Sequence, residues 1–185
     1  MRNKDVIEAY DRGDKLDFIF FWGHTNKSNS VNKTCFSQWY TDSGVFVDRD
    51  FEYDSCEHYM MLHKLFTMNS DNINDPLVDE ILECPTTKGV KAIGRKIPDF
   101  DSNKWDDVKF DIVVEGNFLK FSQDDELKDF LLSTGDKILV EASPFDKIWG
   151  IGLDSHAPNV DNPNTWKGDN LLGYALMEVR DRLKD

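Results

Sequence analysis

Helix boundaries follow one another closely through the middle of the chain, and they limit the possible folds more than any other feature of the sequence. Asp54 and Glu57 form a capping-box pattern, which predicts a helix from Asp54 to about Met68. Further capping residues, prolines and glycines predict four more helices: from Asn74 or Asp75 to Pro85, from Thr86 or Thr87 to about Lys96, from Ser102 onward, and from Asp124 to Thr134. Helices therefore fill most of residues 54–134.

Apolar residues recur within these helices at helical spacing, which predicts their buried sides. The expected buried positions are Tyr59, Leu62 and Phe66 in the first helix, and Trp105, Val108, Ile112 and Leu119 in the helix from Ser102. Outside this region, short apolar runs and helical patterns predict a helix from Asp5 to Arg12, strands at Leu16 to Trp22 and Lys137 to Ala142, a hairpin of Val45 to Val47 with Phe51 to Tyr53, and a final helix from Asn170 to Leu183. The sequence thus predicts one compact, helix-rich α+β domain with a small β-sheet over residues 1–185.

The formal net charge of −13 opposes binding to a long phosphate backbone, because the summed field repels polyanions. One stretch is locally basic, with Lys88, Lys91, Arg95, Lys96 and Lys104. This stretch favours attraction of a small anion or a short nucleic-acid end. An ordinary mixed surface explains the same residues, so both interpretations stay open here.

Several classes of function lack their motifs in this sequence. Three cysteines without CxxC spacing and four scattered histidines indicate no metal site, and we expect no cofactor. No run approaches the roughly 20 apolar residues of a membrane span, so we expect a soluble, cytoplasmic protein with access to the nucleus if the source is eukaryotic. The chain has no GxGxxG motif, P-loop or nucleophile elbow. The remaining carboxylates, lysine and tryptophans suit binding or cleavage of a glycosidic, base-containing ligand.

Two charged residues stand seven positions apart on the helix predicted from Asp54. Glu57 and Lys64 would share a face about 10 Å apart along the axis, a spacing that brackets a small substrate. A capping role for Glu57 and a solvated position for Lys64 account for the same residues.

A glycine-containing loop follows the last predicted strand. The end of the strand carries the carboxylate Glu141, and the loop carries a second carboxylate, an indole and two glycines, namely Asp146, Trp149, Gly150 and Gly152. Loops at strand ends commonly hold binding or catalytic sites. A glycine beside an indole lets a planar ligand approach the backbone closely and stack on the indole. Packing of the indole into the core is the alternative. Trp22 and Gly23, at the end of an earlier strand, are further candidates for binding.

An ordered series of motifs resembles the NADAR family, also called YbiA-like. The matching segments are Phe21-Trp22, Ser55 to Met61 with Lys64, Lys91 to Arg95, Trp105, Lys120-Phe121, Leu131 to Gly135, Leu139 to Asp146, Ile148 to Gly150, Trp166, Gly168, Asn170, Leu172-Gly173 and Leu176-Met177. The resemblance covers about residues 16–183 and leaves residues 1–15 as an N-terminal extension. No single motif is specific, but their order is.

The resemblance implies a compact, helix-rich α+β domain that acts as an N-glycosidase. Members of this family cleave ribose from an exocyclic amino group, either on ribosylamino-pyrimidine phosphates of riboflavin synthesis or on ADP-ribosylated guanine. We expect the second substrate, in nucleic acid or as a nucleotide, with ADP-ribose as the product and a guanine-specific ADP-ribosyltransferase as the functional counterpart. The alternatives are the riboflavin-pathway activity and non-catalytic binding of ADP-ribose or NAD.

The resemblance also assigns roles to residues. We expect Lys64 to attack ribose C1 and form a Schiff base, Glu57 to protonate the leaving amine and later activate water, and Asp146 to orient the ribose or stabilise positive charge. A path through an oxocarbenium-like state, with Glu57 as acid and Asp146 as stabilising carboxylate, is the alternative. The expected substrate-binding residues are Phe21, Trp22, Gly23, Ser55, Arg95, Glu141, Trp149, Gly150 and Asn170.

Overall fold

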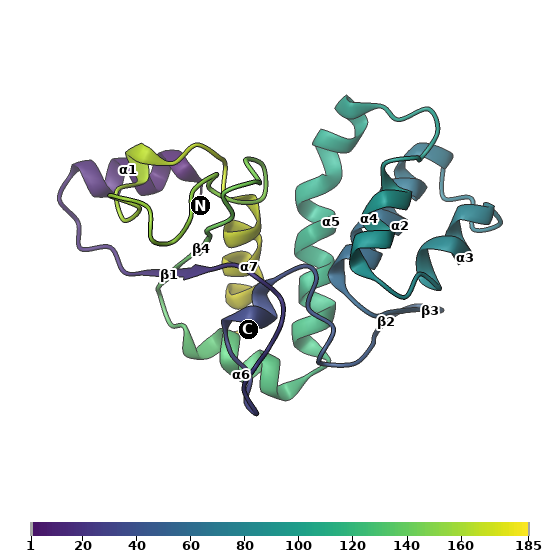
Figure 1. The fold of residues 1–185 in the computed structure, drawn as a ribbon, viewed down its shortest axis with the longest axis horizontal. Coiled ribbons are helices and arrows are strands. Elements are labelled where there is room, and N and C mark those ends of the chain that lie inside the picture. Colours follow the sequence, from purple (N-terminus) through teal and green to yellow (C-terminus); the bar gives the residue numbers. More distant parts are fainter. Residues whose placement is uncertain (1, 185) are drawn as a thin grey trace.

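The computed structural model describes residues 2–184, so Met1 and Asp185, the two ends of the predicted domain, lie outside the described residues. In chain order the elements are α1 (Asn3–Asp11), β1 (Phe18–Phe21), the 3-10 helix η1 (Lys33–Phe36), β2 (Phe46–Asp48), β3 (Phe51–Tyr53), α2 (Cys56–Asn69), α3 (Pro76–Leu82), α4 (Thr87–Gly94), α5 (Ser102–Ser122), α6 (Asp125–Ser133), β4 (Ile138–Glu141), the 3-10 helix η2 (Pro163–Thr165) and α7 (Leu171–Arg182) (Figure 1). The predicted helix-rich α+β class is confirmed. Among the described residues, no helix has both the length and the apolar character needed to cross a membrane.

Helix α5 lies between two groups of elements (Figure 1). Helices α2, α3 and α4 form one group, while α1, β1, β4 and α7 form the other, and α5 packs most extensively against α2 and α7. The side chains predicted to form its buried stripe are only partly buried, and the fully buried positions are Val113, Val114, Gly116, Asn117, Lys120 and Phe121. Three residues of the predicted stripe, Trp105, Ile112 and Leu119, do pack against the core, but the burial of α5 extends beyond one apolar stripe because the helix has neighbours on two sides.

The strands form two separate two-stranded sheets. Strands β2 and β3 make the predicted antiparallel hairpin, whereas β1 pairs in parallel with β4, which lies more than a hundred residues later in the chain. In this register Phe21 is opposite Glu141. The carboxyl ends of β1 and β4 therefore meet at one edge, and the segments that follow both strands start side by side.

Helix α2 begins one residue later than its capping pattern indicates. Ser55 is the N-cap, and its hydroxyl accepts the N–H of His58 at 3.4 Å. The predicted capping box of Asp54 and Glu57 is therefore wrong, because Glu57 occupies the second helical position and does not fold back on the N-cap backbone. The predicted burial of the apolar side of this helix is confirmed at Tyr59, Leu62 and Phe66.

The N-terminal extension packs on the C-terminal part of the chain. The Asn3 side chain donates a 2.9 Å hydrogen bond to the Gly168 carbonyl and accepts one of 2.7 Å from the Tyr174 hydroxyl. Helix α1 also contacts η2. These contacts fix α1 against the same group of elements that holds β1 and β4.

Candidate active site

A cavity of about 460 Å³ lies between the two groups of elements that flank α5. The turn after β1, the segment after η1, the start of α2, the end of α4 and the loop after β4 all contribute to its walls. The carboxylates and cations of its lining are Glu57, Glu141, Asp146, Lys91 and Arg95. Three indoles supply flat apolar walls: Trp22, Trp39 and Trp149. The cavity thus combines titratable groups with stacking surfaces.

Glu57 is the most deeply buried of the three carboxylates, with only 2% of its surface exposed. Its Oε1 atom has no hydrogen-bond partner, although it is fully shielded from solvent. Burial raises the pKa of Glu57 to about 7, and the positive charge of Lys91 and a hydrogen bond from Trp39 oppose this rise. A carboxyl with a pKa near neutrality can both give and take a proton at physiological pH, which suits general acid–base chemistry.

The last residue of β4 and the loop that follows it supply the second and third carboxylates, Glu141 and Asp146. Asp146 Oδ1 accepts the backbone N–H groups of Ile148 at 2.9 Å and Trp149 at 2.8 Å, so this carboxylate shapes the loop that carries it. Burial raises the pKa of Glu141 to about 8, and the negative charge of Asp146 adds to the rise. Glu141 is therefore mostly protonated at neutral pH and is a second proton donor in the cavity.

Glycine at position 150 allows this loop to close over the end of β4. A Cβ atom there would lie 2.8 Å from the carbonyl oxygen of Glu141, a prohibitively short contact with backbone, and 3.1 Å from that of Asp146, which is a tight one. Gly150 therefore has a packing role and does not line the cavity.

Helix α4 delivers both cations of the cavity. Lys91 lies on its last turn and Arg95 is its C-cap residue. Lys91 Nζ is 5.6 Å from the centroid of the Trp39 ring, a cation–π arrangement that places the ammonium beside the aromatic wall. Two cations at one end of a cavity with an acidic interior suit a ligand that carries phosphate groups.

Lys64 lies next to the cavity and not in its lining. Its Nζ donates a 2.8 Å hydrogen bond to the carbonyl oxygen of Gly94 and lies 4.3 Å from the centroid of the Phe100 ring. Burial lowers the pKa of Lys64, the negative charge of Glu57 opposes this shift, and Arg95 adds to it. The amine is thus bound to a neutral acceptor and remains within electrostatic reach of Glu57.

The structure brings most of the predicted site residues together. Seven of them line the cavity: Glu57, Asp146, Trp22, Gly23, Arg95, Glu141 and Trp149. Besides Lys64 and Gly150, three others lie outside its lining. Phe21 packs in the core against Phe36, and Ser55 caps α2. Asn170 bonds the backbone of β4, accepting the N–H of Glu141 at 2.9 Å and donating to the carbonyl of Leu139 at 3.0 Å. These three residues hold the walls in place and do not face the cavity.

Several lining residues do not stand out in the sequence. Lys91 and Phe145 lie within the matching family segments but were not among the predicted site residues, and Gln38 and Trp39 belong to no motif. The segment after η1 reaches the cavity through tertiary contacts with α2 and α5, which local sequence patterns do not encode. The basic stretch and the segment Lys91 to Arg95 were the signals that pointed to the α4 wall.

The fold and the cavity together define a small α+β protein whose site combines buried carboxylates, cations and stacking indoles, as sites for glycosidic ligands do. The model of the NADAR domain matches residues 20–184, and the chain therefore belongs to the NADAR family. This result confirms the resemblance found in the sequence.

The similar proteins include enzymes with named activities. The chain is 44% identical over 172 residues to an N-glycosidase of Acanthamoeba polyphaga mimivirus, with 89% of the chain and 95% of that protein covered. It is 31% identical over 137 residues to the chloroplastic riboflavin biosynthesis protein PYRR of Zea mays, with 72% of the chain and 20% of that protein covered. The NMR structure of E. coli YbiA aligns with a TM-score of 0.67 and 26% identity, covering 92% of this chain and 87% of that one.

Proposed function

We propose that the protein is an N-glycosidase that hydrolyses the bond between ribose C1 and the exocyclic amino group of a nucleobase, and that its substrate is ADP-ribosylated guanine. The observation that carries the proposal is Glu57, a buried carboxyl with a pKa of about 7 and an unpartnered oxygen in a cavity walled by tryptophans. Cleavage of a C–N bond to an amine needs such a proton donor, because the amine is a poor leaving group until it is protonated. The names of several relatives support the same chemistry.

In the alternative path, which needs no covalent intermediate, Glu57 gives its proton to the departing amino nitrogen while the C1–N bond breaks and its electron pair stays with nitrogen. Asp146, half-buried in the same cavity, stabilises the positive charge that develops at C1. The Glu57 carboxylate then takes a proton from water as that water supplies the oxygen. The products are the free amino base and ADP-ribose with a hydroxyl group at C1.

We propose that Lys64 takes part through a covalent intermediate. The C1–O4 bond of the sugar would break first, with Glu57 giving its proton to O4 and the base nitrogen forming a C1=N iminium. The neutral Lys64 amine would leave the Gly94 carbonyl, swing toward the cavity and add to C1, and Glu57 would move one proton from the lysine nitrogen to the base nitrogen, so that the free amino base departs and a C1=N Schiff base to Lys64 remains. Water activated by Glu57 would then add to C1, the lysine would leave as the free amine, and the O4 hydroxyl would close the ring again on C1. The lowered pKa of Lys64 supports this role, because only the neutral amine is a nucleophile.

Recognition of the substrate is assigned to the cavity walls. Arg95 and Lys91 would bind the diphosphate, and Trp149 would stack on a base. The charge of −13 supports an end, a loop or a nucleotide as the target over a long duplex, because extended phosphate contacts would be repelled. A guanine-specific ADP-ribosyltransferase would be the enzyme that makes this substrate.

Hydrolysis of a ribosylamino-pyrimidine phosphate is the second candidate function. The similarity to the Zea mays riboflavin biosynthesis protein favours it. That protein and the N-glycosidase of Nostoc punctiforme have the same sequence identity to this chain, 31%. Both candidate substrates share the same aminal carbon, so the catalytic groups would be the same and the binding walls would differ.

One assay tests the proposal and its alternative. The protein is incubated with an oligonucleotide carrying ADP-ribosyl-guanine and, separately, with a ribosylamino-pyrimidine phosphate, and mass spectrometry follows released ADP-ribose or ribose phosphate. Release of ADP-ribose that is lost in Glu57→Gln supports the proposal. Release of ribose phosphate alone supports the riboflavin-pathway activity, and retained ADP-ribose affinity without any cleavage indicates a binding module.

A further inference from the structure

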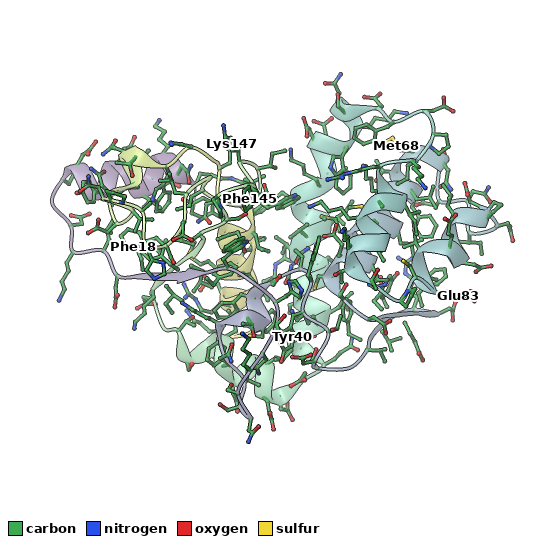
Figure 2. All side chains as sticks on the ribbon, in the orientation of Figure 1. Phe18, Tyr40, Met68, Glu83, Phe145 and Lys147 are labelled. Carbon is green, nitrogen blue, oxygen red and sulfur yellow. The ribbon has the colours of Figure 1, made fainter. Side chains whose placement is uncertain are left out.

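Two exposed aromatic side chains stand together at the cavity. The ring centroids of Trp22 and Phe145 are 6.1 Å apart with their planes tilted by 54°, and both residues contribute to the cavity lining. Trp22 is 49% exposed and Phe145 is 86% exposed, the largest value among the exposed large hydrophobic residues. Figure 2 places Phe145 at the edge of its group of elements that faces α5. Large apolar rings held in water beside a polar cavity indicate a ligand-binding surface.

The backbone explains why the two rings meet. Trp22 directly follows β1, and Phe145 lies in the loop after β4, so the parallel pairing of Phe21 with Glu141 starts both segments at the same edge. The carboxyl ends of parallel strands are where ligands commonly bind, because the loops there are free to vary while the strands stay rigid.

We propose that Trp22 and Phe145 form a stacking subsite for a second nucleobase, one that lies outside the cavity while the scissile bond lies at Glu57. This inference rests on the proposed function and deepens it, because it names the part of the substrate that sets specificity. A substrate with a single base, such as a ribosylamino-pyrimidine phosphate, would not reach the subsite. A substrate with two bases would reach it.

The size of the cavity supports a second base outside it. Its volume of about 460 Å³ lies in the lower half of the range for sites that enclose drug-sized ligands, about 300–1,000 Å³. ADP-ribosyl-guanosine has two purines, three riboses and a diphosphate, so one base remains outside when the glycosidic bond is at Glu57. The same holds for a base that neighbours the modified guanine in an oligonucleotide.

The geometry of the pair also defines how the base would bind. Two stacking contacts at about 3.5 Å each need roughly 7 Å between parallel rings, and the tilted rings of Trp22 and Phe145 are closer than this. A base therefore stacks on the outer face of the pair and is not inserted between its members. This contact is tolerant of base identity, because every base has a π-face.

The test compares kcat/KM for the wild type, Trp22→Ala, Phe145→Ala and Trp22→Phe on three substrates. These are ADP-ribosyl-guanosine as a nucleotide, the same modification within a trinucleotide, and a ribosylamino-pyrimidine phosphate. Ile148→Ala is the matched control, because Ile148 is an exposed apolar residue of the same loop that does not line the cavity. Loss of a stacked base is expected to lower kcat/KM by about 5- to 150-fold, mainly through KM.

The pattern of losses identifies the base. Equal losses on both ADP-ribosylated substrates assign the subsite to the adenine of ADP-ribose, whereas loss on the trinucleotide alone assigns it to the neighbouring base. In either case Trp22→Phe should recover most of the activity, and the alanine variants should lose several-fold less kcat/KM on the substrate with one base, which contacts only the cavity side of the pair. Unchanged kcat/KM in the alanine variants, or an equal loss on the substrate with one base, would overturn the inference.

A binding measurement separates failure of the subsite from failure of the proposed function. If the wild type cleaves none of the substrates, the proposed function is rejected, and titration with ADP-ribose and with a dinucleotide then tests the subsite alone. Weaker binding by Trp22→Ala and Phe145→Ala than by Ile148→Ala supports the stacking subsite. Equal affinities in all variants reject it.

Discussion

The backbone N–H of Glu57 donates a 2.9 Å hydrogen bond to the carbonyl oxygen of Gln38. This bond joins the first turn of α2 to the segment that carries Trp39. The Gln38 side chain is held from the other direction, because Asn117 Nδ2 donates a 2.7 Å hydrogen bond to its Oε1 atom. The proposed acid–base group and its indole wall are therefore both anchored on α5.

We expect Asn117→Leu to lower both stability and activity. Asn117 is fully buried and also bonds the Val113 carbonyl at 2.8 Å, so leucine would leave the Gln38 oxygen buried without a donor. The expected cost is about 1–3 kcal/mol in the free energy of unfolding, measured by urea denaturation. kcat/KM should fall as well, because Glu57 and Trp39 lose their common anchor.

Asn103→Leu is the control for this prediction, because Asn103 is exposed on the first turn of the same helix. It should leave stability and activity close to those of the wild type. Wild-type stability in Asn117→Leu would show that the bond to Gln38 contributes little.

The positions of the two carboxylates proposed to act in catalysis were more predictable than the walls of the cavity. Glu57 and Asp146 are carboxylates near a helix start and in a loop after a strand, and such positions follow from local signals in the sequence. Trp39 and Lys91 reach the cavity only because α2, α4 and the segment after η1 pack together. Nor does the sequence reveal that Lys64 bonds the Gly94 carbonyl, since this contact depends on how two helices meet.

Helix positions were predictable for a similar reason. Capping residues and prolines act within a few positions, and they placed α3, α4 and α6 to within a few residues. The parallel pairing of β1 with β4 depends on contacts between distant segments. The predicted apolar stripe of α5 accounts for only part of its buried surface, because the polar residues Asn117 and Lys120 are also buried, with their hydrogen bonds made to other segments.

The pH profile should show the titration of Glu57. If its protonated form is the acid, kcat/KM falls tenfold per unit above a pKa of about 7. Glu141 has a pKa of about 8 and is the other group that titrates in this range. Steady-state kinetics of Glu141→Gln between pH 5 and 9 separates the two, since a falling limb that disappears in this variant would belong to Glu141.

Glu57 should lower the stability of the folded protein at alkaline pH. Its pKa rises from 4.5 in the unfolded chain to about 7, so the folded state binds more protons between these values and stability decreases as pH increases through this window. Glu57→Gln should therefore be more stable than the wild type at pH 8 by about 2–3 kcal/mol, with little difference below pH 4.5. Urea denaturation at pH 8 and at a pH below 4.5 measures the free energy of unfolding of both proteins.

The exposed Glu80 provides the control for this effect. Glu80→Gln should change stability equally at pH 4.5 and pH 8. Equal stability of Glu57→Gln and the wild type at pH 8 would mean that Glu57 is not desolvated in solution, and the acid–base role proposed for it would lose its physical basis.

Lys64 should form a covalent adduct with the substrate. Borohydride reduces a Schiff base to a stable amine, so adding it during turnover should attach the sugar to the protein, and peptide mass spectrometry locates the modified lysine. We expect the adduct on Lys64, whose amine has a lowered pKa and donates its hydrogen bond to the neutral Gly94 carbonyl, and not to a carboxylate, among the described residues. Lys91 is the internal control, because it lines the same cavity and should stay unmodified.

Lys64→Met separates the chemical role of this residue from its structural one. Loss of the bond to Gly94 alone should lower the free energy of unfolding by about 1 kcal/mol and affect KM through the neighbouring Arg95, leaving kcat within a few-fold. Loss of the nucleophile should instead lower kcat by several orders of magnitude and abolish trapping. Substantial kcat in Lys64→Met without any trapped adduct would transfer the mechanism to the oxocarbenium-like path, in which Glu57 and Asp146 suffice.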